Sequence, residues 1–245
     1  MKLFLLHLVG NGLLLWLGYY WLSIGESDGA HLAWSALVLL IFICSALWLH
    51  GTALARFRPD ANLSFAQAAG RAARNLAPLF VLGIAALIVY ALLAWWHDSF
   101  GHVAFVAGSY ATMRLRKPVP PTSVERGFHV FIWILRWLIV PVILLPLASA
   151  VAVRGWAGWR WGALRPGKRV LYWIEVCALL VVAIWVPLKL VAWVPLAAHF
   201  NTQMISFLAR FGVGYLLFVC GLLAVEFLTS SGTPRATQPS TAGSP

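Results

Sequence analysis

Three positively charged residues lie inside stretches that are otherwise apolar, where burying a charge costs free energy and therefore indicates a function. Arg136, Lys189 and Arg210 lie within runs of Leu, Val, Ile, Phe and Trp. At a helical rise of about 1.5 Å per residue, all three lie within about 12 Å of the outer interface of the membrane, and no carboxylate lies at that depth. Three cations at one level predict a binding site for a small anion or a lipid phosphate. In the alternative reading, Lys189 and Arg210 extend to the outer headgroups and Arg136 bonds a carbonyl that a proline leaves free.

Histidines and carboxylates form a second group of residues with chemical potential. Five histidines fall on the predicted outer side, near four acidic residues: His31, His97, His102, His129 and His199, with Glu26, Asp28, Asp98 and Glu125. These are zinc ligand types, but neither HExxH nor a tight HxH spacing occurs. We therefore predict no metal site, no cofactor and no catalytic residue.

Two further histidines lie near the predicted inner ends of the first two membrane spans. In a helical hairpin, His7 and His50 would reach similar depths. Haem ligation requires such a facing pair and room between the helices. We interpret these two side chains as interfacial histidines.

The composition shows which elements must position these residues. The chain is 62% hydrophobic and 10% charged, with a mean hydropathy of +0.85, whereas soluble proteins have roughly a quarter charged residues. Crossing about 30 Å of hydrocarbon takes roughly 20 helical residues. The sequence therefore predicts an all-α, polytopic transmembrane bundle of about six helices. The predicted spans lie near 3–24, 31–50, 76–96, 129–152, 170–194 and 204–228.

Prolines interrupt two of these spans. Pro141 and Pro146 fall in the fourth span, and Pro187 and Pro195 fall in or beside the fifth. Proline cannot donate a backbone hydrogen bond and leaves a carbonyl of the preceding turn free. The fourth and fifth helices are therefore predicted to be kinked.

The basic residues predict the orientation, because Lys and Arg are enriched in cytoplasmic loops. With the N-terminus inside, the outer side carries Arg114, Arg116, Lys117 and Arg126. The inner side carries Lys2, Arg56, Arg58, Arg71, Arg74, Arg154, Arg160, Arg165, Lys168, Arg169 and Arg235. We therefore expect a multi-pass protein of the cell inner (plasma) membrane with both termini in the cytoplasm.

One outer loop, residues 97–128, does not fit this frame easily. Its apolar part, 99–113, is too short to cross a bilayer, and a basic run follows it. We expect 99–113 to be a surface-lying or re-entrant segment.

The inner loops have the composition of membrane-surface elements. A capped helix is predicted from Ser64. A later stretch interleaves aromatic and basic residues and is expected to bind anionic lipid headgroups at the cytoplasmic face. Its members are Arg154, Trp156, Trp159, Arg160, Trp161, Lys168 and Arg169. The formal charge of +11 follows from cytoplasmic loop composition, so no nucleic-acid partner is expected.

Residues 229–245 are rich in Ser, Thr, Pro and Gly and are predicted to form a disordered cytoplasmic tail, which leaves 1–228 as the transmembrane domain. The leading functional hypothesis is a non-enzymatic membrane protein that binds or moves a small anion or lipid. The alternatives are an accessory subunit that packs against a membrane-protein partner or a second copy of itself, and a metal-dependent membrane enzyme.

Overall fold

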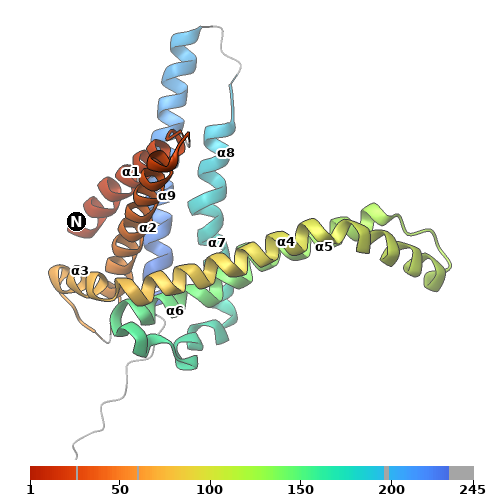
Figure 1. Cartoon of the computed structure of the whole chain (residues 1–245), viewed down its shortest axis with the longest axis horizontal. Helices are drawn as coiled ribbons and strands as arrows, with labels where there is room; N and C mark the ends of the chain where they lie inside the picture. Colours follow the sequence, from red (N-terminus) through yellow and green to blue (C-terminus); the bar gives the residue numbers. More distant parts are fainter. Residues whose placement is uncertain (26, 60, 196–198, 232–245) are drawn as a thin grey trace, which may run out of the picture. The chain divides into compact units, whose positions relative to one another are not determined.

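The computed structural model describes residues 1–25, 27–59, 61–195 and 199–231. Every element of secondary structure in these ranges is helical, which confirms the predicted all-α class (Figure 1). The α-helices are α1 (Lys2–Leu22), α2 (Gly29–Arg56), α3 (Phe65–Arg74), α4 (Leu76–Leu115), α5 (Pro121–Ile134), α6 (Val140–Arg154), α7 (Val170–Leu180), α8 (Val186–Ala192) and α9 (Phe200–Ser231). Two π-helical turns, η1 (Leu135–Ile139) and η4 (Val181–Trp185), and two 3-10 helices, η2 (Gly155–Gly158) and η3 (Trp161–Lys168), complete the order.

Six helical stretches are long and apolar enough to cross a membrane, as predicted. They are Lys2–Leu22, Gly29–Arg56, Leu76–Leu115, Pro121–Gly158, Val170–Ala192 and Phe200–Ser230. Many large apolar side chains on these helices are exposed, for example Trp16, Leu87 and Ile205. Lipid is as apolar as these side chains, so a membrane protein has no need to bury them. The chain is an integral, multi-pass membrane protein.

The helices fall into two compact units. The first comprises Met1–Phe80 and Leu145–Pro245, and the second comprises Val81–Leu144. Helices α4 and α6 each contribute to both units.

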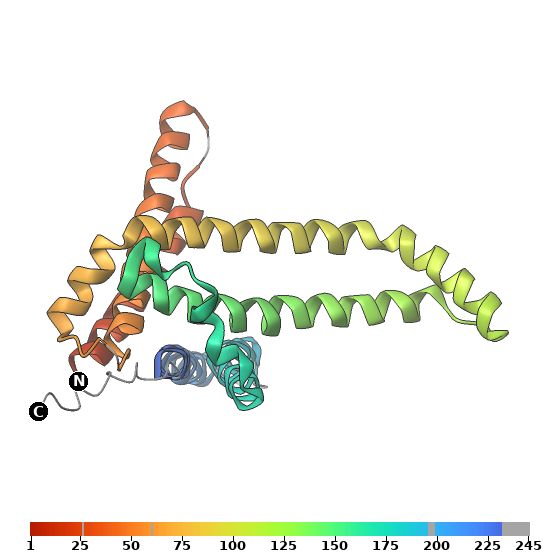
Figure 2. The same cartoon turned by 90° about the horizontal axis from the view of Figure 1, so that it is seen from below.

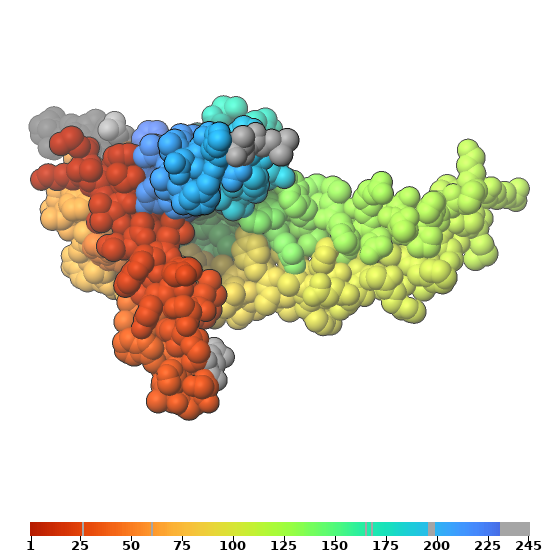
Figure 3. All heavy atoms as spheres, turned by 90° about the horizontal axis from the view of Figure 1, so that it is seen from above, coloured from red at the N-terminus to blue at the C-terminus, as the bar shows by residue number. Residues whose placement is uncertain are grey.

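In the first unit, α9 packs against α1, α2 and α7. Buried small and branched residues, among them Ala53, Val176 and Val219, fill the space between these helices. Figure 3 shows the side chains of α1, in red, lying against those of α9, in blue. The three helices α1, α2 and α9 thus form one packed group.

Helix α3 begins where the sequence predicts. Ser64 Oγ accepts a hydrogen bond from the backbone N–H of Gln67, and Gln67 Oε1 accepts one from the N–H of Ser64. This reciprocal capping satisfies two donors at the start of the helix. The buried Ala68 and Ala72 lie on one face of α3, which packs against α2.

The second unit is an antiparallel helical hairpin (Figure 2). The rings of Phe100 and Phe128 stack at 3.5 Å, and the Trp96 ring meets Phe128 edge-on at 5.3 Å. Near the tip, a Cβ on Gly108 would lie 3.2 Å from the backbone of Pro121, so helices α4 and α5 approach closely there.

The structure differs from the sequence-based expectation at 97–115. These residues continue α4 without a break, whereas the sequence suggested a separate surface-lying or re-entrant segment at 99–113. At about 1.5 Å per residue the 40 residues of α4 extend about 60 Å, twice the thickness of the hydrocarbon core. The polar residues around His97 interrupt the apolar run but do not end the helix.

Both proline-containing spans, which the sequence predicts to be kinked, contain a π-helical turn; a kink stays a prediction. Turn η1 ends two residues before Pro141, and turn η4 ends two residues before Pro187. Within the second unit, the Tyr90 hydroxyl donates a hydrogen bond of 2.8 Å to the carbonyl of Arg136, which supplies one of the partners that a broken helix needs.

The predicted tail, 229–245, overlaps the end of α9, which continues to Ser231. The remaining part of the predicted tail, 232–245, lies outside the described residues.

Candidate metal centre

Three helices of the first unit bring two histidines and a glutamate together. His7 comes from α1, His50 from the last turns of α2, and Glu226 from the last turns of α9. One ligand atom of each residue lies within 4.8 Å of the other two. The side chains of His7 and Glu226 are buried, at 0% and 6% exposure, whereas that of His50 is 31% exposed. We call these three residues the His–Glu triad.

The backbone of α1 sets the orientation of the His7 ring. Nδ1 lies 3.2 Å from the carbonyl oxygen of Leu3, and because a carbonyl only accepts, Nδ1 carries the proton of this bond. The buried Asn11 amide donates to the carbonyl of His7 at 2.9 Å. In the neutral ring, the lone pair is then on Nε2, which faces the interior of the triad.

His7 and Glu226 meet without a hydrogen bond. Nε2 of His7 and Oε2 of Glu226 are 3.4 Å apart, and both atoms are buried with no hydrogen-bond partner. Two acceptors that face each other in a buried site need either a proton or a cation between them.

The third member binds the same carboxylate from the other side. His50 Nδ1 lies 2.6 Å from Glu226 Oε1, within hydrogen-bonding distance. The rings of His7 and His50 meet edge-on with centroids 5.6 Å apart. Both carboxylate oxygens therefore face imidazole nitrogens.

One helical turn beyond the triad, buried hydroxyls fix α2 and α9 to each other. Ser230, four residues after Glu226, donates to the carbonyl of Leu54, four residues after His50, at 3.0 Å. The hydroxyl of Ser149 in α6 lies 3.1 Å from that of Ser230. These contacts hold the helices on which His50 and Glu226 stand in a fixed register.

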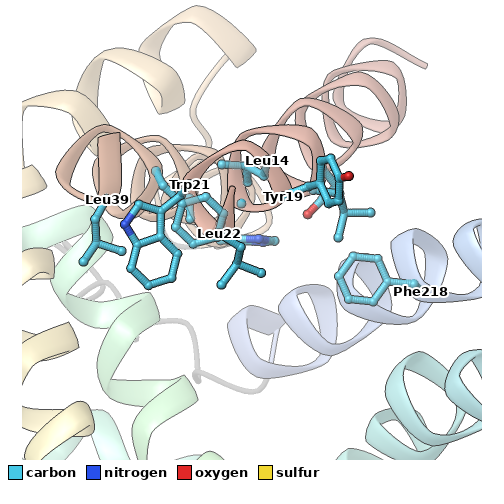
Figure 4. Close-up of a pocket in the computed structure, with 12 residues that line it drawn as sticks. Leu14, Tyr19, Trp21, Leu22, Leu39 and Phe218 are labelled. Carbon is cyan, nitrogen blue, oxygen red and sulfur yellow. The ribbon is translucent and has the colours of Figure 1, made fainter. Parts of the chain in front are cut away.

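A cavity of about 580 Å³ lies between α1, α2 and α9, and His50 is the one member of the triad that lines it (Figure 4). His50 and Asn11 line its end beside the triad, and the rest of its wall is almost entirely apolar: Leu14, Leu15, Gly18, Tyr19, Trp21, Leu22, Leu39, Phe42, Ala46 and Phe218. Figure 4 shows Phe218 projecting from α9 toward α1. The indole N–H of Trp21 donates to the Ser35 hydroxyl at 3.0 Å and joins α1 to α2 at the far end.

Sequence reasoning anticipated part of this triad. It placed His7 and His50 at similar depth but interpreted them as interfacial side chains, and it overlooked Glu226. The signal for Glu226 is a single carboxylate in the apolar run Leu223-Ala224-Val225-Glu226-Phe227. An acidic residue in such a run is a functional candidate by default, because its charge needs a partner.

The predicted anion site divides between the two units. Lys189 and Arg210 belong to the first unit, and Arg136 belongs to the second. Arg210 donates to the carbonyl oxygens of Ser206 and Leu190, each at 3.1 Å. Arg136 Nε is buried without a hydrogen-bond partner. A common pocket for the three cations stays a prediction.

The predicted outer histidines show two local contacts. The rings of His97 and His129 lie 4.4 Å apart in the second unit, and Glu125 is 3.8 Å from His129. In the loop before α2, Asp28 accepts from the backbone N–H and the ring of His31, and these hydrogen bonds lower the pKa of the Asp28 carboxyl. Across the described ranges, the His–Glu triad is the one cluster of three or more ligand-type residues with metal-site spacing.

The predicted headgroup surface lies on η2, η3 and the residues beside them. The tryptophans Trp156, Trp159 and Trp161 are exposed there, as are Arg154, Arg160 and Arg169. The side chain of Lys168 lies outside the described part of the chain. Lipid binding by this surface stays a prediction.

Comparisons with known proteins give no relative: no family model, no curated protein and no solved structure matches the chain. The geometry of the His–Glu triad is therefore the basis for a functional conclusion.

Proposed function

We propose that this integral membrane protein holds a divalent transition-metal ion of the zinc class in the His–Glu triad. The observation that carries the proposal is the approach of two buried acceptors, His7 Nε2 and Glu226 Oε2, at 3.4 Å without a hydrogen bond. A cation between them satisfies both atoms at once.

The distances support this assignment. Nitrogen and oxygen ligands at about 2.0–2.2 Å from a tetrahedral ion lie about 3.3 Å from each other. The His7–Glu226 separation is 3.4 Å, and all three ligand atoms fall within 4.8 Å of one another. The His50 Nδ1–Glu226 Oε1 distance of 2.6 Å is shorter than this tetrahedral spacing, so the His50 ring, which is partly exposed, has to move away from the carboxylate to complete the set.

The ligand types select the metal. Imidazole nitrogens suit zinc and its transition-metal neighbours, whereas calcium and magnesium prefer oxygen ligands alone. The Nδ1 proton of His7 on the Leu3 carbonyl is the outer contact that metal-ligating histidines usually make. Three protein ligands leave the fourth position of a tetrahedral ion open, as in catalytic zinc sites. A metal was part of the third sequence-based hypothesis, a metal-dependent membrane enzyme, and this arrangement supports that part with ligands other than those the sequence suggested.

The rest of the functional assignment follows from the sequence. We place the protein in an inner (plasma) membrane with both termini cytoplasmic, because the basic residues gather on that side. All three ligands then lie near the cytoplasmic ends of their spans. Binding of an anion or lipid at Arg136, Lys189 and Arg210 is a separate proposal that the triad neither requires nor opposes.

The direct test is the zinc content of the purified full-length protein. We expect about one zinc per chain after exposure to zinc and removal of the excess, and loss of that zinc in Glu226→Gln. Glu175→Gln is the matched control, since it removes a carboxylate from another span, in α7. The proposal is wrong if the folded wild-type protein shows no saturable zinc binding, or if Glu226→Gln binds zinc as the wild type does. In either case the triad is a buried ion pair and no more.

A further inference from the structure

The cavity beside the His–Glu triad has about the length that one acyl chain covers in a bilayer. On α1 its lining runs from Asn11 to Leu22, about 16 Å at 1.5 Å per residue. Half of a hydrocarbon core of about 30 Å is about 15 Å. Its polar lining residues are Asn11 and His50, and Asn11 lies toward the N-terminus of α1, whereas the apolar Leu22 is the last residue of that helix. An acyl chain whose head lies at the triad, near the cytoplasmic end of α1, and whose tail points toward the outer end of α1 would fill this length.

Access to the cavity comes from the side that faces lipid. Leu15 and Tyr19, which line it, are 52% and 75% exposed. In a membrane-spanning helix such exposure means contact with acyl chains. The occupant therefore enters from the bilayer rather than from water.

The net charge of the metal centre determines which head group the occupant carries. A divalent ion bound by two neutral imidazoles and one carboxylate keeps a net charge of one positive unit. In a buried site of low polarity this charge favours a singly charged anionic oxygen at the open position. A carboxylate supplies that charge and neutralises the centre.

Volume limits the number of chains. The cavity of about 580 Å³ is within the range of small-molecule sites, about 300–1,000 Å³. Gly18 and Ala46 in its wall keep it open, and a Cβ added to Gly18 would already lie 3.5 Å from the Phe42 ring. A single chain is the occupant that this space accommodates.

Together these observations lead to the inference, which rests on the proposed metal centre. We propose that the cavity binds the chain of a long-chain carboxylic acid taken from the bilayer, and that the acid's carboxylate occupies the open position on the metal at the His–Glu triad.

The test uses the full-length protein in lipid nanodiscs and a 16-carbon carboxylic acid that carries a photoreactive diazirine at its chain end. With zinc bound, we expect the label on peptides of α1, α2 or α9 that line the cavity. Unlabelled palmitic acid should compete at least about tenfold better than hexadecanol, since only the acid binds the metal. After a chelator has removed the zinc, palmitic acid should compete with the label no better than hexadecanol does. Equal competition by the two compounds on zinc-loaded protein would overturn the proposal.

Two variants separate this proposal from the proposed metal centre. Gly18→Phe fills the cavity without touching a ligand, and should abolish labelling while the zinc content stays at the wild-type value. Leu13→Phe, on an exposed position of the same helix, is the control and should change neither. The proposed metal centre is tested by the zinc content alone. Zinc-loaded protein that takes no label, or Gly18→Phe protein that labels normally, overturns the carboxylic acid proposal and leaves the metal centre intact.

Discussion

Removing the buried polar atoms of the His–Glu triad together, rather than singly, gives the clearest test of why they are there. In metal-free protein, His7 Nε2 and Glu226 Oε2 are both buried without a hydrogen bond. Each such atom costs about 1–3 kcal/mol of stability, and together the two cost about 2–6 kcal/mol. Their mutual attraction, when His7 is protonated, offsets part of this cost.

We therefore expect the double variant His7→Leu/Glu226→Met to be more stable than the metal-free wild type. Replacing buried charged groups with apolar ones of similar size typically leaves stability unchanged or raises it by about 1–4 kcal/mol. For a chain of this length, 1 kcal/mol corresponds to about 2–4 °C in the unfolding midpoint. Glu226→Met alone should gain less, because His7 Nε2 keeps no partner.

The assay is the thermal midpoint in detergent, followed by the fluorescence of the 14 tryptophans, with a chelator and with zinc. Zinc at 100 times its dissociation constant should stabilise the wild type by about 2.7 kcal/mol and leave the double variant unchanged. Glu175→Met serves as the control, which should still respond to zinc. A chelated wild type that is more stable than the double variant, and that does not respond to zinc, would refute the reasoning, because His7, His50 and Glu226 would then form a structural cluster of ionisable groups without a metal.

Three further predictions concern the fold and the topology. Gly221→Val should destabilise the protein by about 1–3 kcal/mol, because an added Cβ would lie 2.6 Å from that of Ala183, whereas Gly212→Val on the same helix meets nothing within 4 Å and should leave the unfolding midpoint unchanged. Tyr90→Phe should lower stability by about 1 kcal/mol, since the carbonyl of Arg136 loses its donor; an unchanged midpoint would show that water or another group replaces the hydroxyl. Ser123→Cys, in a background without the three native cysteines, should react with an impermeant thiol reagent on intact cells, and reaction only after lysis would contradict cytoplasmic termini.

The class of the fold and its six spans could be predicted from the sequence because a bilayer imposes simple rules on length and polarity. The end of α4 could not. His97, Asp98 and His102 interrupt the apolar run, and an apolar run is what identifies a span. A helix, however, ends through capping residues or proline, and none of these three residues stops it.

For the triad, counting residues along the predicted spans identifies two of the three members but not the third. Counting residues from the span ends placed His7 and His50 at one level, since α1 and α2 are consecutive and antiparallel. Glu226 is more than 170 residues away in the chain, and only the packing of α9 beside both helices brings it to them. Such a partner is found by asking which charge in an apolar run lacks a counterpart.

The π-helical turn η4 has an implication for how this chain tolerates changes in length. A π-turn accommodates one residue more than an α-helical turn, so it acts as an inserted residue that the helix has absorbed. In an α-helix one residue corresponds to a rotation of about 100°. Deleting one residue from Val181–Trp185 would therefore restore regular α-helical winding without rotating the helix on either side, and Pro187 would stay beside Gly214, where a Cβ added to Gly214 would lie 3.5 Å from Pro187 Cα. A deletion in the regular part of α7 would instead rotate everything beyond it by about 100°. The span should thus tolerate the loss of one residue within η4 far better than the loss of one residue in α7.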